Sequence, residues 1–397
     1  MTHCAKCGAC TAVCPVYKVT GRESLTARGK LHLLERLPTK KCSAAYADII
    51  SKCLLCGACE SVCSRGINIL PRIVEARRDL PLFTGDHPFL ARLAEKALNT
   101  PSLVAACSSL GTNIAHLLPK DSGLRLRLGL SSETYPDPAQ NKNQTTSPEQ
   151  ATVAYFSGCL ARYPQPEISH ATQKLVLKST GSKPFIPMNQ GCCGQAAYSN
   201  GNNNDAKQLA KQNITAFADN DLPILTSCAS CYSHLSSYPD LLQDEEEWAT
   251  PAIDFAARLR EFSSFFVDST QLSKELHAIN AESPPETVFY HDPCHLRFKH
   301  QITNQPRQLL TEAGFILREL PFGPQCCGMG GLFHLNQPEL SEKIRNRLLT
   351  KLGQPSPDFV TTTCSGCLLQ LRLGLHQQKQ TPTVKHLAVL LAEKIKT

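Results

Sequence analysis

The sequence CAKCGACTAVCP, from Cys4 to Pro15, and the sequence CLLCGACESVC, from Cys53 to Cys63, share one spacing of cysteines, C-x2-C-x2-C-x3-C. Thiolates at i, i+3 and i+6 reach one face of a four-iron cube only where the backbone loops tightly around it. Gly8 and Gly57, which follow the second cysteine of each run, permit that close approach. The spacing therefore predicts iron-sulfur ligation within the first 80 residues.

This spacing is that of the bacterial two-cluster ferredoxins, in which the fourth cysteine of each run binds the other cluster. It predicts two [4Fe-4S] cubane clusters, held by Cys4, Cys7, Cys10 and Cys63, and by Cys53, Cys56, Cys59 and Cys14. Zinc is the main alternative, but a zinc site usually shows two separated C-x2-C pairs, and a third cysteine exceeds what a tetrahedral ion needs. The interpretation that follows is a protein that carries electrons.

Length and composition indicate a soluble globular protein. At 397 residues, 42% hydrophobic and 19% charged, the chain is long enough for two or three domains. The N-terminus MTHCAKCGAC has no apolar leader, so the 20 cysteines predict a cytoplasmic protein rather than disulfides. The most apolar window, 101–118, is interrupted by polar residues and does not predict a membrane span. Peripheral association with the inner face of the cell membrane stays open, since such a helix could lie at the interface.

The net charge of +7 is concentrated at the N-terminus, where residues 1–80 hold 13 Lys and Arg against 6 Asp and Glu. A cubane with four thiolates carries a net charge of about −2 when oxidised, so two clusters would offset roughly half of this excess. The sequence has no zinc-finger, RNP-type or aromatic-interleaved basic motif. We therefore expect no nucleic-acid partner.

Ten further cysteines form two sets that repeat in order and in spacing. The first set is Cys159, Cys192, Cys193, Cys228 and Cys231, and the second is Cys294, Cys326, Cys327, Cys364 and Cys367. Equivalent cysteines lie 134 to 136 residues apart. An offset this constant indicates that one domain has been duplicated.

The hydrophobic pattern repeats with the cysteines. Strands are expected at 152–157 and 287–291, near 183–186 and 316–320, and at 223–226 and 359–362. Helices are expected at 168–179 and 305–313, near 206–218 and 338–352, and as closing helices at 253–260 and 384–393. The predicted fold is an α+β multidomain protein, with an α-helical two-cluster ferredoxin domain (1–80), a helical segment and polar linker (81–150), and two α/β domains (151–285 and 286–397).

The vicinal cysteines constrain the chemistry of each repeat. Adjacent side chains of a strand point to opposite faces, so both thiols reach one site only where the backbone turns. Gly194 and Gly328, which complete each CCG, tolerate the positive φ that such a turn needs. Each repeat has five cysteines, one more than a cubane or a zinc ion uses, which favours a larger or bridged cluster. Free thiols or a redox-active vicinal disulfide are the alternative.

These motifs resemble the cysteine-rich CCG domains of heterodisulfide reductase. The matching stretches are FSGC at 156–159, GCCGQ at 191–195, CASC at 228–231, HDPCH at 291–295, CCGMGG at 326–331 and CSGC at 364–367. With the ferredoxin part ahead of them, and TARGKLHLLERL at 26–37, the chain is similar to the iron-sulfur subunit of glycolate oxidase and of related D- or L-lactate dehydrogenases. It departs from that pattern at Ser64, where proline is usual, and at Met329, which is closer to lactate-utilisation relatives.

The resemblance implies a subunit of an oxidoreductase complex, with one noncubane iron-sulfur cluster in each CCG domain. A separate FAD-containing dehydrogenase subunit would oxidise glycolate or lactate, and this chain would pass the electrons towards quinone or another carrier. GMGG at 328–331 is not G-x-G-x-x-G, so no flavin or nicotinamide site is expected here. Two alternatives stay open: a catalytic subunit that cleaves a disulfide, as in heterodisulfide reductase, and the iron-sulfur subunit of anaerobic glycerol-3-phosphate dehydrogenase.

Several residues near the motifs are given structural rather than catalytic roles. His291, Asp292 and His295 flank Cys294, and we expect them to form hydrogen bonds or to pack around a cluster. Arg28 and Lys30 are interpreted as a solvated helix face. Cys42 and Cys107 lie outside every motif and are interpreted as free thiols.

Overall fold

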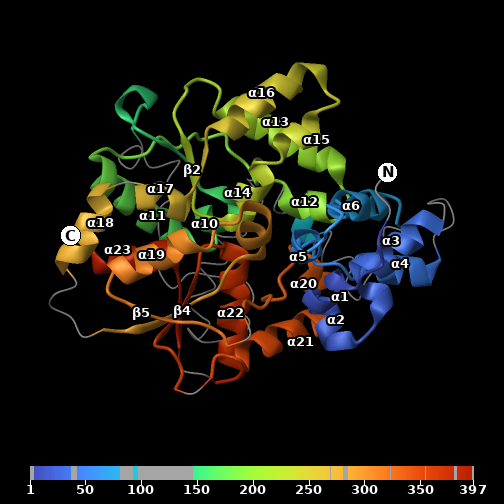
Figure 1. Cartoon of the computed structure of the whole chain (residues 1–397). Helices are drawn as coiled ribbons and strands as arrows, with labels where there is room; N and C mark the ends of the chain where they lie inside the picture. The colour runs from blue at the N-terminus through green and yellow to red at the C-terminus, as the bar shows by residue number, and fades with distance from the viewer. Residues whose placement is uncertain are drawn as a thin grey trace.

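The computed structural model describes residues 4–36, 43–80, 93–96, 146–268, 270–279, 285–321, 323–353, 355–379 and 382–395. Most of the expected helical segment and linker, together with Cys42 and Cys107, lies outside these residues. The N-terminal part lies on one side of two units that each contain a parallel sheet (Figure 1).

The N-terminal part is helical. Its elements are α1 (Ala9–Val13), α2 (Pro15–Thr20), η1 (Glu23–Leu25), α3 (Ala27–Arg36), α4 (Ala44–Ser51), α5 (Ala58–Ser61) and α6 (Leu70–Arg78). Helices α1 and α5 begin directly after Gly8 and Gly57, whose φ angles of 84° and 81° are left-handed. The core of this part contains Ile50, Ile69 and Ile73, each at most 1% exposed.

The first cysteine-rich unit is built on three parallel strands in the order β1 (Ala154–Phe156), β2 (Ile224–Thr226) and β3 (Leu259–Glu261). Its helical elements are η2 (Pro148–Gln150), α10 (Gly158–Arg162), α11 (Pro166–Thr180), α12 (Gln195–Ser199), α13 (Asn203–Ala216), α14 (Ala229–Leu235), α15 (Tyr238–Leu242), α16 (Glu246–Ala257), α17 (Phe262–Asp268) and α18 (Thr270–Ile279). The strand expected near 183–186 is present as a single parallel bridge between Phe185 and Ala154.

The second cysteine-rich unit repeats this topology. Its parallel sheet has the order β5 (Ile316–Arg318), β4 (Thr287–Tyr290), β6 (Phe359–Thr362) and β7 (Thr383–His386). Its helices are the π-helix η4 (His295–His300), α19 (Asn304–Glu312), α20 (Phe333–Asn336), α21 (Pro338–Leu349), α22 (Ser365–Gln377) and α23 (Leu387–Lys394). The two sheets therefore correspond strand for strand, once the Phe185 bridge is included.

The predicted closing helices are wrong in part. Helix α16 ends at Ala257, and the chain then forms β3, in which Leu259 pairs with Ile224. In the second unit β7 precedes α23, and Val384 pairs with Val360. Both segments are strands because each pairs with a neighbouring strand and completes the edge of its sheet. A local hydrophobic pattern does not show this pairing, because the partner strands β2 and β6 are distant in the sequence.

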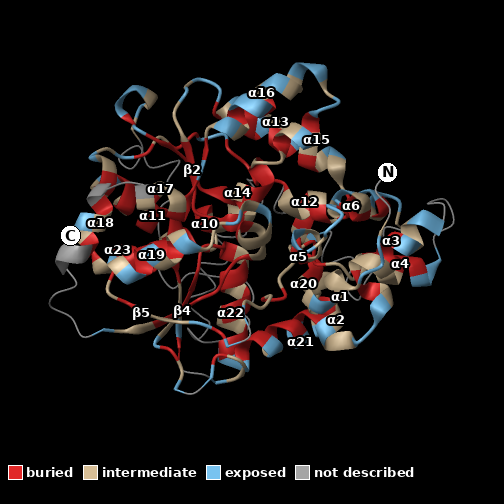
Figure 2. Cartoon of the chain, viewed as in Figure 1, coloured by how far each residue is buried: buried red, intermediate tan, exposed pale blue. Residues whose placement is uncertain are grey.

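The cores of the two units are continuous. Side chains from β1, β4 and both C-x2-C helices belong to one buried cluster, and buried residues run through the middle of both units in Figure 2. Helix α23 packs on α11, where Lys174 Nζ donates to the carbonyls of Ala392 (3.0 Å) and Ile395 (2.8 Å). The two units therefore bury a shared interior rather than meeting only at their surfaces.

Cysteines follow the carboxyl ends of the central strands. Cys159 comes after β1, Cys228 after β2, Cys294 after β4 and Cys364 after β6. Because the carboxyl ends of parallel strands meet at one edge of a sheet, each unit gathers its cysteines at that edge.

Candidate metal centres

The first predicted ligand set lines one cavity of the N-terminal part. Cys4, Cys7, Cys10 and Cys63 surround a space of about 470 Å³, together with Cys59. Cys7 is exposed. The loop bends sharply here, because Lys6 and Gly8 both have positive φ.

The second predicted ligand set lines a neighbouring cavity. Cys14, Cys53, Cys56 and Cys59 surround a space of about 420 Å³. In both cavities the fourth cysteine comes from the other run, as the crossover requires. Cys59 lines both cavities, so the two sites adjoin.

Basic residues at these cavities were not anticipated. The interpretation of Lys30 as solvated is wrong: it is 1% exposed, it lines the second cavity, and its Nζ donates to the carbonyl of Leu25. Its position in the helix was a usable signal, because residue 30 lies on the same face of α3 as Ala27 and Leu34. Arg28 is half-buried at the first cavity and forms an ion pair with Glu23.

Arg77 connects the N-terminal part to the first unit. Its Nη2 donates to the carbonyls of Cys53 (2.5 Å) and Ser51 (3.0 Å), and its Nη1 donates to the carbonyl of Ser199 (2.5 Å). One guanidinium therefore fixes the backbone of a predicted ligand and the position of helix α12.

The five cysteines of the first unit form one connected group of thiols. The Sγ atoms of Cys159 and Cys192 lie 3.7 Å apart. Further hydrogen bonds connect the others, since Cys193 donates to Cys192, and Cys231 donates to Cys193 and Cys228. All five predicted ligands of this unit are thus brought together.

In the second unit four of the five predicted ligands form a connected group, and the fifth, Cys294, shares a cavity with Cys326. The Sγ atoms of Cys327 and Cys367 lie 3.2 Å apart, and hydrogen bonds join Cys326 to Cys327 and Cys364 to Cys367. His291 adds a nitrogen, since its ring and the sulfurs of Cys327 and Cys367 lie within 4.8 Å of one another.

The turn at each vicinal pair has the predicted conformation. Gly194 has φ 90° and Gly328 has φ 83°, which confirms the expectation of positive φ. The carbonyl oxygen of Ser341 would lie 2.5 Å from a Cβ atom at Gly328. The turn therefore requires glycine for its conformation and for its closeness to α21.

Polar side chains inside the first unit hold the vicinal turn. Asn213 Oδ1 accepts from the N–H of Gly191 (2.8 Å), and Asn213 Nδ2 donates to the carbonyl of Cys192 (2.9 Å). The hydroxyl of Tyr238 donates to the carbonyl of Cys193 (2.9 Å). The sequence pattern did not identify these residues, because an asparagine in a helix has no distinctive spacing.

The thiols of the two units meet at their C-x2-C segments. Cys228 donates a hydrogen bond to Cys364, and Ser230 Oγ lies 3.3 Å from the sulfur of Cys364. His295 Nδ1 lies 3.2 Å from Ser230 Oγ, which agrees with the expected hydrogen-bonding role of this histidine. The two groups of cysteines are thus adjacent.

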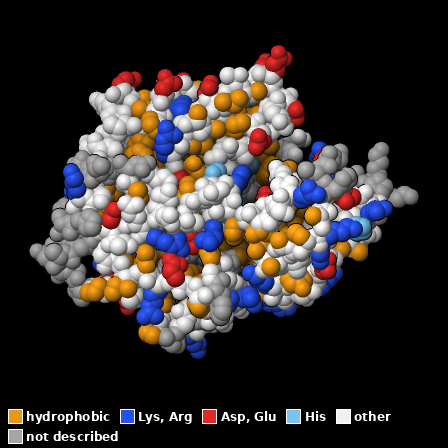
Figure 3. All heavy atoms as spheres, viewed as in Figure 1, with side chains coloured by type: hydrophobic (Ala, Val, Ile, Leu, Met, Phe, Trp, Pro, Cys, Tyr) orange, Lys and Arg blue, Asp and Glu red, His pale blue; other side chains and the backbone are white. Residues whose placement is uncertain are grey.

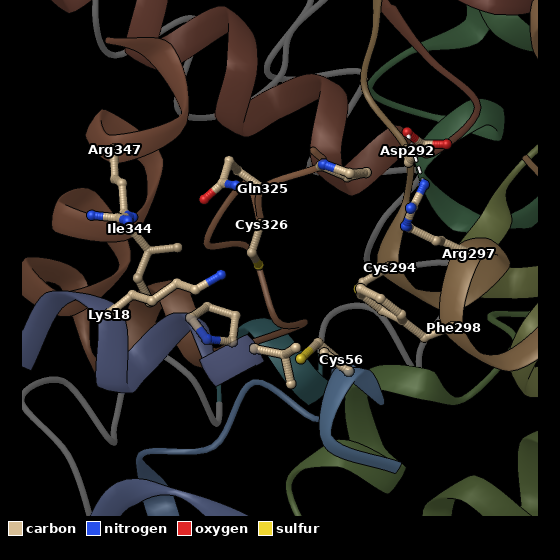
Figure 4. A pocket seen from close by; sticks show the side chains of 14 residues that line it. Lys18, Cys56, Asp292, Cys294, Arg297, Phe298, Gln325, Cys326, Ile344 and Arg347 are labelled. Carbon is tan, nitrogen blue, oxygen red and sulfur yellow. Dashed lines mark ion pairs between the residues drawn. The ribbon is translucent and has the colours of Figure 1, made fainter. Parts of the chain in front are cut away.

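A third cavity joins the N-terminal part to the second unit. Cys56, Cys294 and Cys326 line a space of about 510 Å³ that opens to solvent. Figure 4 shows Cys56 and Cys326 on opposite sides of this cavity, with Lys18 and Arg347 towards one end. In this cavity a predicted ligand of the second N-terminal site, Cys56, lies near two predicted ligands of the second CCG unit, Cys294 and Cys326.

Known protein families match both halves of this arrangement. The 4Fe-4S dicluster domain matches residues 1–67, and the cysteine-rich domain (CCG) matches residues 153–236 and 288–372. These matches confirm the predicted ferredoxin part and the duplication of the CCG domain.

A full-length relative then decides the family. The chain is 30% identical over 422 residues to the probable glycolate oxidase iron-sulfur subunit of Bacillus subtilis, covering 99% of this chain and 94% of that protein. The chain belongs to the family of glycolate oxidase iron-sulfur subunits. It is 24% identical to the glycolate oxidase iron-sulfur subunit of Escherichia coli, over 93% of this chain and 89% of that protein.

The chain is also similar to a shorter relative and to a solved structure. Lactate utilization protein A of Geobacillus kaustophilus is 30% identical over 240 residues, which are 60% of this chain and 98% of that protein. The crystal structure of a hypothetical protein from Helicobacter pylori has the same fold, with a TM-score of 0.57 at 10% identity over 93% of this chain and 67% of that chain.

The donor sets of this family member fit iron-sulfur groups. The pKa of Cys192 is well below its usual value because Cys159 and Cys193 donate hydrogen bonds to its sulfur. The pKa of Cys327 is also well below its usual value, because the thiol of Cys326 donates to its sulfur and the sulfur of Cys367 lies 3.2 Å away. Hydrogen bonds to neighbouring thiols and burial raise the pKa of Cys193, Cys231 and Cys367. Several thiolates can therefore share one of these buried groups only where a metal balances their charge.

Asp292 and its partners are structural, as expected. Both carboxylate oxygens of Asp292 accept hydrogen bonds of 2.8 Å from Arg307, and Arg297 lies 3.7 Å away. Such bidentate pairs are rigid. Among the residues that the structure describes, no helix is both long enough and apolar enough to cross a bilayer.

Proposed function

We propose that this chain is the electron-transfer subunit of a FAD-linked dehydrogenase that oxidises glycolate or lactate. The relatives named above include glycolate oxidase iron-sulfur subunits and a lactate utilization protein, which supports this substrate class. The observation that carries the proposal is the continuous series of thiol groups from the protein surface to the centre of the CCG units.

The series has three junctions. It begins at exposed Cys7, and Cys59 joins the two N-terminal cavities. Cys56 shares a cavity with Cys294 and Cys326, and Cys364 contacts Cys228 across the two units. Iron-sulfur groups supply one-electron transfer when they are bound. The residues of this chain would hold such groups close to one another, and the series meets water at Cys7 and at the open cavity of Cys294 and Cys326.

We assign the ligands as the sequence predicts. The two N-terminal sets would each hold a [4Fe-4S] cubane, and the five cysteines of each CCG domain would hold a noncubane iron-sulfur cluster. The connected thiols of each unit support this assignment. Domain limits at 1–80, 81–150, 151–285 and 286–397 follow the same division.

Iron content tests the cofactor assignment. Anaerobically purified protein should carry about sixteen irons per chain, four for each of four clusters. About eight irons with bound zinc would reject the noncubane assignment, because His291, Cys327 and Cys367 offer a set of ligands that zinc also accepts.

Reconstitution tests the function. The purified chain alone should not oxidise glycolate or lactate, and addition of the FAD subunit should restore substrate-dependent reduction of a quinone. Cys327→Ser should decrease quinone reduction while direct dye reduction by the flavin subunit stays unchanged, because flavin chemistry precedes the clusters. Equal loss of both activities would contradict this order. Co-sedimentation with anionic vesicles tests whether quinone reduction involves peripheral membrane binding.

A second candidate is catalysis at a CCG domain. The cavity lined by Cys294 and Cys326 opens to solvent, so a small molecule could reach these two thiols. A disulfide substrate could then be reduced there. Turnover of a thiol disulfide by the isolated chain, with an artificial reductant and no flavin partner, would favour this candidate over the electron-transfer subunit.

A further inference from the structure

Lys30 is a buried cation at the second N-terminal site. It is 1% exposed within α3, and its Nζ donates to the carbonyl of Leu25. It lines the cavity formed by Cys14, Cys53, Cys56 and Cys59. In the part of the chain that the structure describes, no carboxylate forms an ion pair with it.

A buried ammonium needs a nearby negative charge. Desolvation opposes the charged form, so such a lysine is kept charged only by an anionic neighbour. Burial lowers the pKa of the Lys30 ammonium and nearby Arg77 lowers it further, whereas the sulfurs of Cys53, Cys14 and Cys59 oppose this shift. The other lysine of this cavity, Lys52, is neutralised by Asp48, whose Oδ1 lies 2.5 Å from its Nζ.

Among the residues that the structure describes, the first N-terminal site has no equivalent cation. Its nearest counterpart is Arg28, whose Nη2 lies 2.5 Å from Glu23 Oε1, so that the pair is neutral overall. Lys6 and Arg65 also line this site, but both are exposed to water. Charges in water are screened and act weakly at a distance. The two sites therefore have similar thiols in different electrostatic surroundings.

We propose that Lys30 raises the reduction potential of the group bound by Cys14, Cys53, Cys56 and Cys59 above that of the group bound by the first site. This inference rests on the ligand sets of the proposed function. Reduction adds one electron, and a buried positive charge stabilises the added negative charge. Because Cys56 leads to the CCG site of the second unit, the site with the higher potential lies on the inner side of the pair.

Potentiometric titration followed by paramagnetic resonance tests the proposal on the full chain. Lys30→Gln keeps a hydrogen-bond donor for Leu25 and removes the charge, whereas Lys30→Arg keeps the charge. Lys30→Gln should decrease the reduction equilibrium constant of the second cubane at least tenfold, which is about 59 mV for one electron. Lys30→Arg should change it less than threefold, and the first cubane should not change in either variant.

Arg36→Gln is the matched control, since Arg36 is an exposed cation on the same helix and lines neither N-terminal cavity. It should shift neither cubane by more than threefold, because water screens its charge. A shift below threefold in Lys30→Gln, or equal shifts of both cubanes, would overturn the proposal.

A second uncharged variant is needed in case Lys30→Gln does not assemble the cluster of the second site. If Lys30→Gln loses iron from the second site, Lys30→Met is measured in the same way. Loss of that iron in both neutral variants would overturn the proposal in favour of a structural role for Lys30. Absence of both cubanes from the unmodified chain would instead reject the proposed function, so the two failures are distinguishable.

Discussion

The backbone N–H of Ala229 donates a hydrogen bond of 2.8 Å to the carbonyl of Thr363, which joins the C-x2-C segment of the first unit to that of the second. Ala229 is 1% exposed and Thr363 is 0% exposed, so water does not compete for this bond. It holds Cys228 against Cys364. The two CCG sites therefore form one continuous arrangement of thiols.

The crossover of the fourth cysteines can be tested with two serine variants. Cys14→Ser should alter the resonance signal of the cluster that Cys53, Cys56 and Cys59 would hold, because Cys14 lines their cavity. Cys7→Ser should alter the other signal, since Cys7 lines only the first cavity. Spectra of the reduced variants provide the measurement. If both variants perturb the same signal, the crossover assignment is wrong.

Gly328 should be intolerant of a side chain. Gly328→Ala places a Cβ atom 2.5 Å from the Ser341 carbonyl oxygen at φ 83°, whereas Gly353, at φ 77°, has nothing within 4 Å of its added Cβ. The left-handed conformation alone costs about 1 kcal/mol, and the contact should bring the loss for Gly328→Ala to about 3 kcal/mol. Urea unfolding and iron content check this. Gly353→Ala is the control for the left-handed conformation alone. An equal loss of unfolding free energy in Gly328→Ala and Gly353→Ala would show that α21 moves away from the added methyl group.

Asn213 should stabilise the vicinal turn of the first unit. Asn213→Ala leaves the N–H of Gly191 and the carbonyl of Cys192 without their buried partner, which should cost about 3 kcal/mol and decrease iron binding in that unit. Gln208→Ala, at an exposed position of the same helix, should cost about 0.5 kcal/mol or less. Thermal unfolding with iron analysis compares the two. A similar loss from both would assign the effect to the helix itself.

His386 should make stability depend on pH. Its Nδ1 accepts from the N–H of Ala388 at 3.1 Å, and burial lowers the pKa of His386 from 6.5 to about 4. The unfolded chain therefore binds the proton more tightly, so stability decreases as the pH falls from about 6.5 to 4, by about 3 kcal/mol in total.

Asparagine at this position separates titration from capping. His386→Asn keeps an oxygen that caps α23 but does not titrate. Unfolding measured from pH 7 to pH 4 should show a slope that is smaller in the variant, with similar stability at pH 7. An unchanged slope would mean that other groups cause the acid sensitivity.

Local sequence patterns were sufficient to predict the features that depend on the spacing of cysteines and glycines along the chain. The two cysteine runs predicted a dicluster domain, and the constant offset between Cys159 and Cys294 predicted the duplication, both of which the family matches confirm. The positive φ of Gly194 and Gly328 followed from the need to turn both thiols to one side. These features depend on residues close together in the chain, so the sequence carries them directly.

Long-range packing decided the remaining features. The segments 259–261 and 383–386 are strands because they pair with β2 and β6, and burial of Lys30 depends on the cavity that α3 covers. The junctions of Cys56 with Cys294 and of Cys228 with Cys364 join segments over 100 residues apart. The sequence by itself therefore predicted which thiols belong to each candidate site. Only the tertiary structure decided which groups are neighbours, because that depends on how the three parts pack together.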